Sequence, residues 1–168
     1  IQPVVGRKKP GDFRDEVIVE AYLALIANYF PQERVLLNVL PLEMRYAGPK
    51  EAVFHAILRK NYGCTHIVIG RDHAGVGDFY PSEAAIEIFE QFPDLGIRPV
   101  TIRGDFFYCY RCGGIASERN CPHSGDDVLP FCGTDIARMF RAGKTPPPEI
   151  MRPEVSAVVR EANEPFVT

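Results

Sequence analysis

A chain of 168 residues is long enough for one domain with a buried core, or for a large part of one. Hydrophobic residues make up 46% and charged residues 24%, which matches an ordinary globular protein and excludes a disordered one. The formal charge of −3 gives no basic field, and no apolar run is long enough for a bilayer span or placed like a signal peptide. We therefore expect a cytoplasmic protein with no nucleic-acid partner and no membrane segment.

Helices and strands are predicted to alternate in the first part of the chain. The helices are expected at 15–28, at 49–61 with Pro49 in its first turn and Gly63 as its left-handed stop, and from Ser82, with that serine as its cap. The strands are expected at 35–40, 65–69 and 97–102. Such alternation predicts an α/β core with a parallel sheet covered on both faces.

The pattern changes after Thr101 to a segment rich in cysteine and turn residues. A helix is expected at 133–143, an extended connector at 145–153 and a last helix at 153–163. We therefore divide the chain into an α/β core at residues 1–103 and a smaller helical subdomain, held by a metal, at residues 104–168.

The segment GRDHAGVG, from Gly70 to Gly77, follows a predicted buried strand directly. Ligands gather at the carboxyl ends of strands in parallel sheets. Glycines at 70, 75 and 77 would allow positive φ and bring backbone N–H groups close to an anion, while Arg71 and His73 supply side-chain donors. The alternative interpretation is a plain glycine-rich turn in which Asp72 pairs with Arg71. Neither a Walker sequence nor a dinucleotide fingerprint is present in this segment.

Cys109, Cys112 and Cys121 form C-x2-C-x8-C, a spacing that suits a metal knuckle and a returning third ligand. Five cysteines, three of them crowded together, make a poor disulfide framework. A redox pair or buried thiols are the alternatives, but Gly113 and Gly114 favour a knuckle over the helix start that a redox CxxC requires. The sequence therefore predicts structural zinc, with Cys132 or Asp126 among the possible fourth ligands.

The segment from Pro41 to Gly77, PLEMRYAGPKEAVFHAILRKNYGCTHIVIGRDHAGVG, resembles the core of the ATP sulfurylases, the sulfate adenylyltransferase family. The resemblance continues through the cysteines to CGTDIARMFRAG and MRPEV, and so covers nearly the whole chain. It implies a nucleotidyltransferase core of Rossmann-like, parallel-sheet architecture. His123 resembles the histidine near the cysteines of zinc-bearing members, which makes it the implied fourth ligand.

The resemblance also implies roles for particular residues. Gly70, Arg71, Asp72 and His73 would line the ATP phosphates, with Arg71 and His73 as the catalytic pair. Ala74 would offer its backbone N–H to sulfate. Val100 would meet adenine through its backbone, and Ile97 would shape the nucleotide, although both are also ordinary apolar strand residues. Arg45 is a further candidate for a supporting cation, whereas His55 and His66 are assigned no chemistry.

The implied reaction joins ATP and sulfate into adenosine 5′-phosphosulfate and pyrophosphate, or runs in reverse. Mg²⁺ is expected with ATP, and members of the family commonly form homo-oligomers. The family's QxRNP and HxGH segments do not occur in these residues and lie upstream in its members, so we expect a carboxyl-terminal portion of a longer enzyme. Two alternatives stay open at this point: a non-catalytic nucleotide- or sulfate-binding fragment, and a zinc-centred interaction module.

Overall fold

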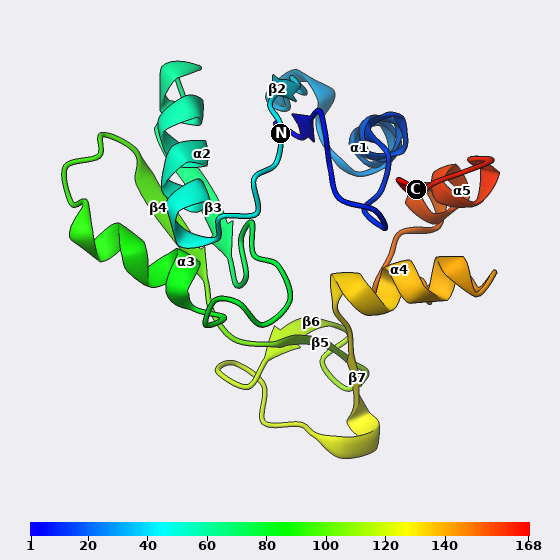
Figure 1. Ribbon diagram of the computed structural model, residues 1–168. Helices are drawn as coiled ribbons and strands as arrows, with labels where there is room; N and C mark the ends of the chain where they lie inside the picture. Colours follow the sequence, from blue (N-terminus) through cyan, green and yellow to red (C-terminus); the bar gives the residue numbers. More distant parts are fainter. The chain divides into compact units, whose positions relative to one another are not determined.

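The computed structural model describes residues 1–168, and their contacts divide the chain into two compact units (Figure 1). One unit contains residues 45–104, and the other contains residues 1–44 together with 105–168. The domains predicted from the sequence, 1–103 and 104–168, assign the first 44 residues to the α/β core. In the structure these residues belong to the unit that contains 105–168. They group with the C-terminal part because helix α1 (Asp15–Tyr29) packs against helix α5 (Pro153–Glu161).

The unit 45–104 is built on two parallel strands, β3 (His66–Gly70) and β4 (Arg98–Ile102), paired from His66–Arg98 to Gly70–Ile102. Helix α2 (Pro49–Asn61) precedes them, and helix α3 (Ala84–Glu87) with the 3-10 helix η2 (Ile88–Gln91) connects them. The predicted α2, β3 and β4 are thus confirmed, with Pro49 in the first turn of α2 and Gly63 at φ 90° after its end.

The core of this unit lies on one face of the sheet. It contains Ala52, Ala56, Ile67, Ile69, Ala85, Ile86, Phe89 and Ile97. On the other face Val68 is 58% exposed and its strand partner Val100 is 47% exposed. The expectation of a sheet covered on both faces is therefore wrong for this chain, because α2 and α3 both pack on the same side (Figure 1).

The other unit contains two small sheets and three longer helices. Strands β1 (Val4–Val5) and β2 (Leu40–Pro41) pair in parallel, and β5 (Phe106–Cys109) pairs antiparallel with β6 (Gly114–Ser117) and β7 (Val128–Pro130). Helix α4 (Gly133–Arg141) follows, and two short 3-10 helices, η1 (Gln32–Arg34) and η3 (Gly125–Asp127), lie in the connections. The α/β class is confirmed, with two small parallel sheets.

Two local predictions are corrected by the structure. The run 35–40 is not a buried strand: only Leu40 enters β2, and Leu36 is 77% exposed. Ser82 does not cap a helix, because α3 begins at Ala84 and its first turn is closed by the Ala84 N–H donating to the Pro81 carbonyl (3.0 Å).

None of the helices combines the length and the apolar composition that a membrane span requires.

The two faces of β3 give a direct test of this arrangement. Ile69 is fully buried, so Ile69→Ala is expected to lower the free energy of unfolding by about 2–5 kcal/mol, through lost apolar contacts and a residual cavity. Val68→Ala, one residue away on the exposed face, is expected to lower it by less than about 1 kcal/mol. Chemical denaturation of both variants measures the difference, and equal losses would contradict the one-sided core.

Candidate functional site: a loop after β3 and a cysteine cluster

The segment that follows β3 is held in a defined shape by its own backbone. The Asp72 N–H donates to the Ser82 carbonyl (2.9 Å), and the Gly75 N–H donates to the Asp72 carbonyl (3.0 Å). The Gly48 N–H, at the start of α2, donates to the Ala74 carbonyl (2.9 Å). These bonds place the amino end of α2, where the helix dipole is positive, beside the loop.

Only one of the three loop glycines predicted to have positive φ does so. Gly77 has φ 48°, but Gly70 and Gly75 do not have positive φ, whereas Asp72 (φ 58°) and Ala74 (φ 56°) do. A left-handed alanine is strained by roughly 1–2 kcal/mol, and such strain is concentrated at functional sites. No backbone carbonyl accepts the Ala74 N–H, so this donor is available to a ligand.

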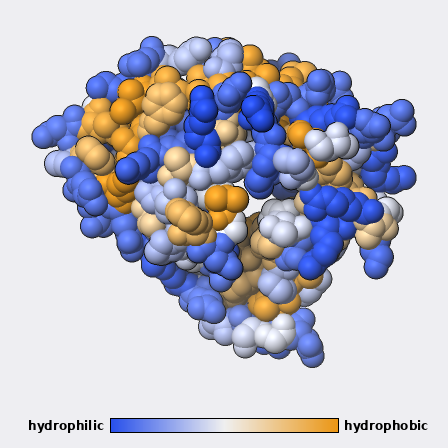
Figure 2. All heavy atoms as spheres, in the orientation of Figure 1, coloured by the Kyte–Doolittle hydropathy of each residue, from blue (hydrophilic) through white to orange (hydrophobic).

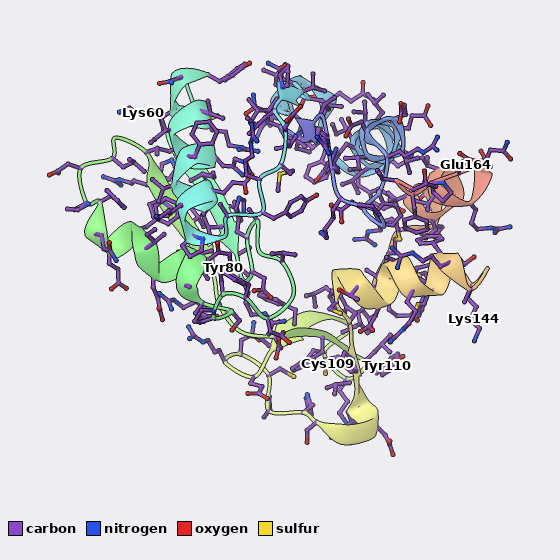
Figure 3. The ribbon with its side chains drawn as sticks, viewed as in Figure 1. Lys60, Tyr80, Cys109, Tyr110, Lys144 and Glu164 are labelled. Carbon is purple, nitrogen blue, oxygen red and sulfur yellow. The ribbon has the colours of Figure 1, made fainter.

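The predicted loop residues differ in exposure. Arg71 and Asp72 are exposed, while His73 and Ala74 are partly buried. Arg71 is therefore accessible to solvent directly after the carboxyl end of β3. Tyr80 marks the far end of the same loop in Figure 3, and its ring covers Gly48, which has φ 53°.

The two predicted residues of β4 lie elsewhere. Ile97 is 5% exposed and belongs to the core, just before the amino end of β4, whereas Gly70 pairs with Ile102 at the other end. Five strand residues correspond to roughly 16 Å, so the structure does not bring Ile97 to the loop. Val100 lies at mid-strand on the exposed face. The loop residues are thus brought together, while Ile97 and Val100 are separated from them and point to opposite faces.

Three titratable side chains, His73, His55 and Glu51, lie behind the loop, each in contact with the next. His73 Nε2 lies 3.0 Å from His55 Nδ1, and His55 Nε2 lies 3.4 Å from Glu51 Oε1. The Glu51 carboxylate accepts the backbone N–H of Arg45 at Oε1 (2.9 Å) and that of Ala47 at Oε2 (2.8 Å). Glu51 and His55 are 3% and 2% exposed, which makes this a buried polar cluster inside an apolar core.

The cluster favours neutral histidines. Burial lowers the pKa of His73 to about 4, with further lowering by the charges of His55 and Arg59 and an opposing effect of Glu51. Burial also lowers the pKa of His55, again helped by Arg59 and opposed by Glu51. His73 is therefore uncharged at neutral pH when no ligand is bound.

Sequence reasoning gave His55 no role, since a helical histidine is usually an ordinary core residue. The available signal was its spacing from Glu51: residues four apart share a helix face. Arg45, predicted as a supporting cation, contributes its backbone N–H to Glu51.

The cysteines and His123 form a compact cluster on the hairpin of β5 and β6. His123 Nδ1 lies 3.4 Å from Cys109 Sγ, 3.5 Å from Cys112 Sγ and 3.4 Å from Cys121 Sγ, and the last two sulfurs are 3.7 Å apart. A tetrahedral ion with metal–sulfur bonds of about 2.3 Å requires ligand atoms about 3.5–3.8 Å apart. The four side chains therefore fit a tetrahedral metal ion.

Local backbone geometry supports a metal knuckle. The Cys112 N–H donates to Cys109 Sγ (3.3 Å), and the Gly113 N–H donates to the Cys109 carbonyl (2.9 Å), with Gly113 at φ 69°. Burial raises the pKa of the Cys109 thiol, but N–H donation from Cys112 and the hydrogen bonds of the neighbouring thiols bring it down to about 7. The same thiol contacts raise the pKa of Cys112 to about 11.

The other proposed fourth ligands lie outside this cluster. Cys132 Sγ donates instead to Asp135 Oδ2 (3.1 Å), in the first turn of α4, and Asp126 is absent from the group of ligand atoms. Figure 3 labels Cys109 at the end of β5, with Tyr110 following it.

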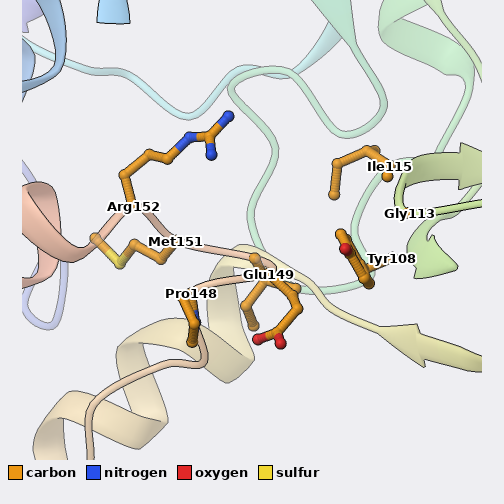
Figure 4. Close-up of a pocket in the computed structure, with 9 residues that line it drawn as sticks. Tyr108, Gly113, Ile115, Pro148, Glu149, Met151 and Arg152 are labelled. Atoms are coloured by element: carbon orange, nitrogen blue, oxygen red, sulfur yellow. The ribbon is translucent and has the colours of Figure 1, made fainter. Parts of the chain in front are cut away.

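A separate cavity of about 470 Å³ lies between this hairpin and the connector before α5. Figure 4 shows Tyr108, Gly113 and Ile115 on the hairpin side and Pro148, Glu149, Met151 and Arg152 on the connector side. None of the predicted site residues lines this cavity. It is therefore distinct from both the loop and the cysteine cluster.

Comparison with known proteins gives a consistent result across the chain. The family model described as ATP-sulfurylase matches residues 1–162. Proteins named sulfate adenylyltransferase from Ignicoccus hospitalis and Hyperthermus butylicus are each 54% identical over 167 residues, 99% of this chain. The alignment covers 44% and 43% of them, so the chain spans less than half the length of the curated relatives it matches.

One solved structure has a similar fold. It is described as a hexameric APS kinase from Thiobacillus denitrificans and matches 98% of this chain and 30% of its own, with a TM-score of 0.71 and 23% identity. At this identity the match supports the fold alone.

The glycines of the loop can be tested for the conformations described above. Gly77→Ala is expected to lower the free energy of unfolding by roughly 1–2 kcal/mol, because φ 48° is unfavourable for alanine although no atom blocks its Cβ. Gly70→Ala, which has free space and no positive φ, is the matched control and is expected to be near neutral. Denaturation midpoints measure both, and an equal effect would contradict the loop conformation.

Proposed function

The chain belongs to the ATP-sulfurylase family, and we propose that it forms the nucleotide-binding part of a sulfate adenylyltransferase. The reaction joins ATP and sulfate into adenosine 5′-phosphosulfate and pyrophosphate. The observation that carries the proposal is the continuous match over 99% of the chain to relatives of that name, at 54% identity. The loop after β3 supports it, since its groups suit a polyanion.

The loop would act by binding and orienting charge. Sulfate has no proton to lose and is a weak nucleophile, so a general base offers nothing to this reaction. The rate must come from holding two anions in line and from neutralising the charge that builds up on the α-phosphorus and the departing pyrophosphate. Arg71 supplies a planar cation, Ala74 supplies a backbone N–H, and the amino end of α2 adds its dipole.

Within this proposal Gly70, Arg71, Asp72 and His73 contact the phosphates of ATP, and Ala74 contacts sulfate. Mg²⁺ bound with ATP supplies further neutralisation of the pyrophosphate oxygens. The β4 residues have less support: the exposure of Val100 is that of its side chain and does not support a backbone contact with adenine, and the buried position of Ile97 gives no support for a ligand contact. The core is then a Rossmann-like nucleotidyltransferase sheet, and self-association remains a prediction.

We also propose that Cys109, Cys112, Cys121 and His123 hold a structural Zn²⁺ in the unit that contains the hairpin. Three thiolates and one imidazole in tetrahedral arrangement are a set that zinc prefers. All four positions are filled by protein atoms, so no coordination site is left for a water or a substrate. The ion would add to the small hydrophobic cluster of Phe107, Ala116 and Val128 in this short, turn-rich segment.

The function is tested by direct catalysis. The chain is incubated with adenosine 5′-phosphosulfate, pyrophosphate and Mg²⁺, and ATP formation is followed, with the Ignicoccus hospitalis relative as the positive control. ATP formation by the chain supports a complete site. Binding of adenosine 5′-phosphosulfate without turnover identifies a nucleotide-binding part that requires further residues, and the absence of both contradicts the proposal.

Arg71→Ala is expected to weaken binding of adenosine 5′-phosphosulfate by about tenfold or more, because a charge-assisted hydrogen bond contributes about 1.5–3 kcal/mol. The matched control is Arg98→Ala, an exposed arginine at the other end of the same sheet, which should leave the affinity unchanged. Isothermal titration calorimetry measures both. Equal affinities of wild type and Arg71→Ala would contradict the assignment of the loop to the binding site.

Zinc content gives a separate test. The purified chain is expected to contain about one zinc ion, and Cys112→Ser should lose most of it and unfold the hairpin region. Cys64→Ser and Cys132→Ser are the controls, since both thiols are exposed and lie outside the cluster. Elemental analysis measures the metal, and unchanged zinc in Cys112→Ser would contradict the ligand set.

A further inference from the structure

The contacts behind the loop assign a role to two residues that neither the sequence pattern nor the comparisons single out. We propose that Glu51 and His55 are positioning residues, which hold the His73 ring in a single orientation and a single tautomer, with its proton on Nε2 and its Nδ1 unprotonated. This inference deepens the proposed function, because His73 belongs to the loop that would bind the nucleotide.

The argument starts at Glu51. Its two oxygens accept N–H groups from Arg45 and Ala47, at 2.9 and 2.8 Å, so both oxygens act as acceptors. The carboxylate is 3% exposed and lies in the first turn of α2, where the helix dipole also stabilises a negative charge. Glu51 is therefore a fixed anion at the buried end of the cluster.

This anion determines which nitrogen of His55 carries the proton. Nε2 of His55 is buried and has no hydrogen-bond partner, and its charged neighbour is Glu51 Oε1 at 3.4 Å, an ion-pair distance. An unprotonated Nε2 would place a lone pair against a carboxylate in a buried site, which is unfavourable. The proton of neutral His55 therefore belongs on Nε2, and its Nδ1 becomes an acceptor.

The acceptor in turn determines the state of His73. Its Nε2 lies 3.0 Å from His55 Nδ1, so one of the two nitrogens must carry the proton between them. Because His55 Nδ1 is unprotonated, the proton belongs to His73 Nε2. The lowered pKa values of both rings agree with this neutral arrangement. His73 Nδ1 is then an acceptor, and it can donate only after the ring takes up a second proton.

The consequence concerns the ligand. A polyanion near His73 favours protonation at Nδ1, which would give an imidazolium that donates at both nitrogens, to the ligand and to His55. Glu51 and His55 would then stabilise the charged His73 ring through the hydrogen bond from its Nε2–H to His55 Nδ1. A hydrogen-bond acceptor has the same effect on a catalytic histidine in other enzymes. Glu51 and His55 would contribute to binding without touching the ligand.

Nitrogen NMR of the chain labelled with ¹⁵N-histidine tests the inference without a ligand or turnover. The chain has four histidines, so single substitutions assign every ring. At neutral pH we expect His73 to show a protonated Nε2 and an unprotonated Nδ1, and a nitrogen–nitrogen coupling across the hydrogen bond between His73 and His55. A protonated Nδ1 on neutral His73, or no coupling between the two rings, would overturn the proposal.

Two variants test the cause. Glu51→Gln removes the anion and is expected to abolish the preference of His73 for Nε2–H, while His55→Phe keeps a buried ring but removes the acceptor and should do the same. His66→Asn, in the same unit but outside the cluster, is the control and should leave His73 unchanged. An unchanged tautomer in either variant that remains folded would contradict the proposal, and if neither folds, the wild-type coupling decides.

Binding separates this inference from the proposed function. In folded His55→Phe, affinity for adenosine 5′-phosphosulfate is expected to fall by about tenfold. If wild type does not bind the compound, the proposed function fails while the tautomer result stands. If wild type binds and His55→Phe binds equally well, the positioning role fails while the function stands.

Discussion

The close packing of α2 on β3 is the contact on which the rest of the unit 45–104 depends. Ala52 and Ala56 are fully buried against the face of β3 that carries Ile67 and Ile69. Small side chains at these two helix positions allow the helix and the strand to approach closely. Glu51 and His55 immediately precede the two alanines and share the same buried face. One helix face therefore serves both as the hydrophobic support of the strand and as the polar support of the loop that follows it.

The sequence was sufficient for features that local patterns determine. The α2 helix has a proline start and a glycine stop, and β3 and β4 are apolar runs joined by a helical crossover, so their pairing could be predicted. The grouping of Cys109, Cys112 and Cys121 followed from spacing, and His123 followed from the resemblance. Each of these signals lies within a few residues of the feature that it predicts.

Other features depend on contacts between distant residues and were not accessible in this way. The run from Val35 to Leu40 has the composition of a buried strand, but only Leu40 finds a partner strand and a covered face. The contact of His55 with His73 joins residues 18 positions apart, and its meaning depends on Glu51 as the third member. The left-handed conformations of Asp72 and Ala74 contradict the usual preference for glycine, which is the kind of local exception expected at a functional loop.

Exposed apolar groups are present on this chain, and Figure 2 shows hydrophobic patches between the hydrophilic side chains.

The cysteine cluster shows which substitution its ligand set could accept. His123 approaches the sulfurs through Nδ1, the ring nitrogen nearer to the main chain. A cysteine at this position would carry its sulfur only one bond short of that nitrogen, so a four-thiolate centre lies within a single substitution. The exchange would replace a neutral imidazole by a thiolate and so raise the negative charge of the ligand set from three to four.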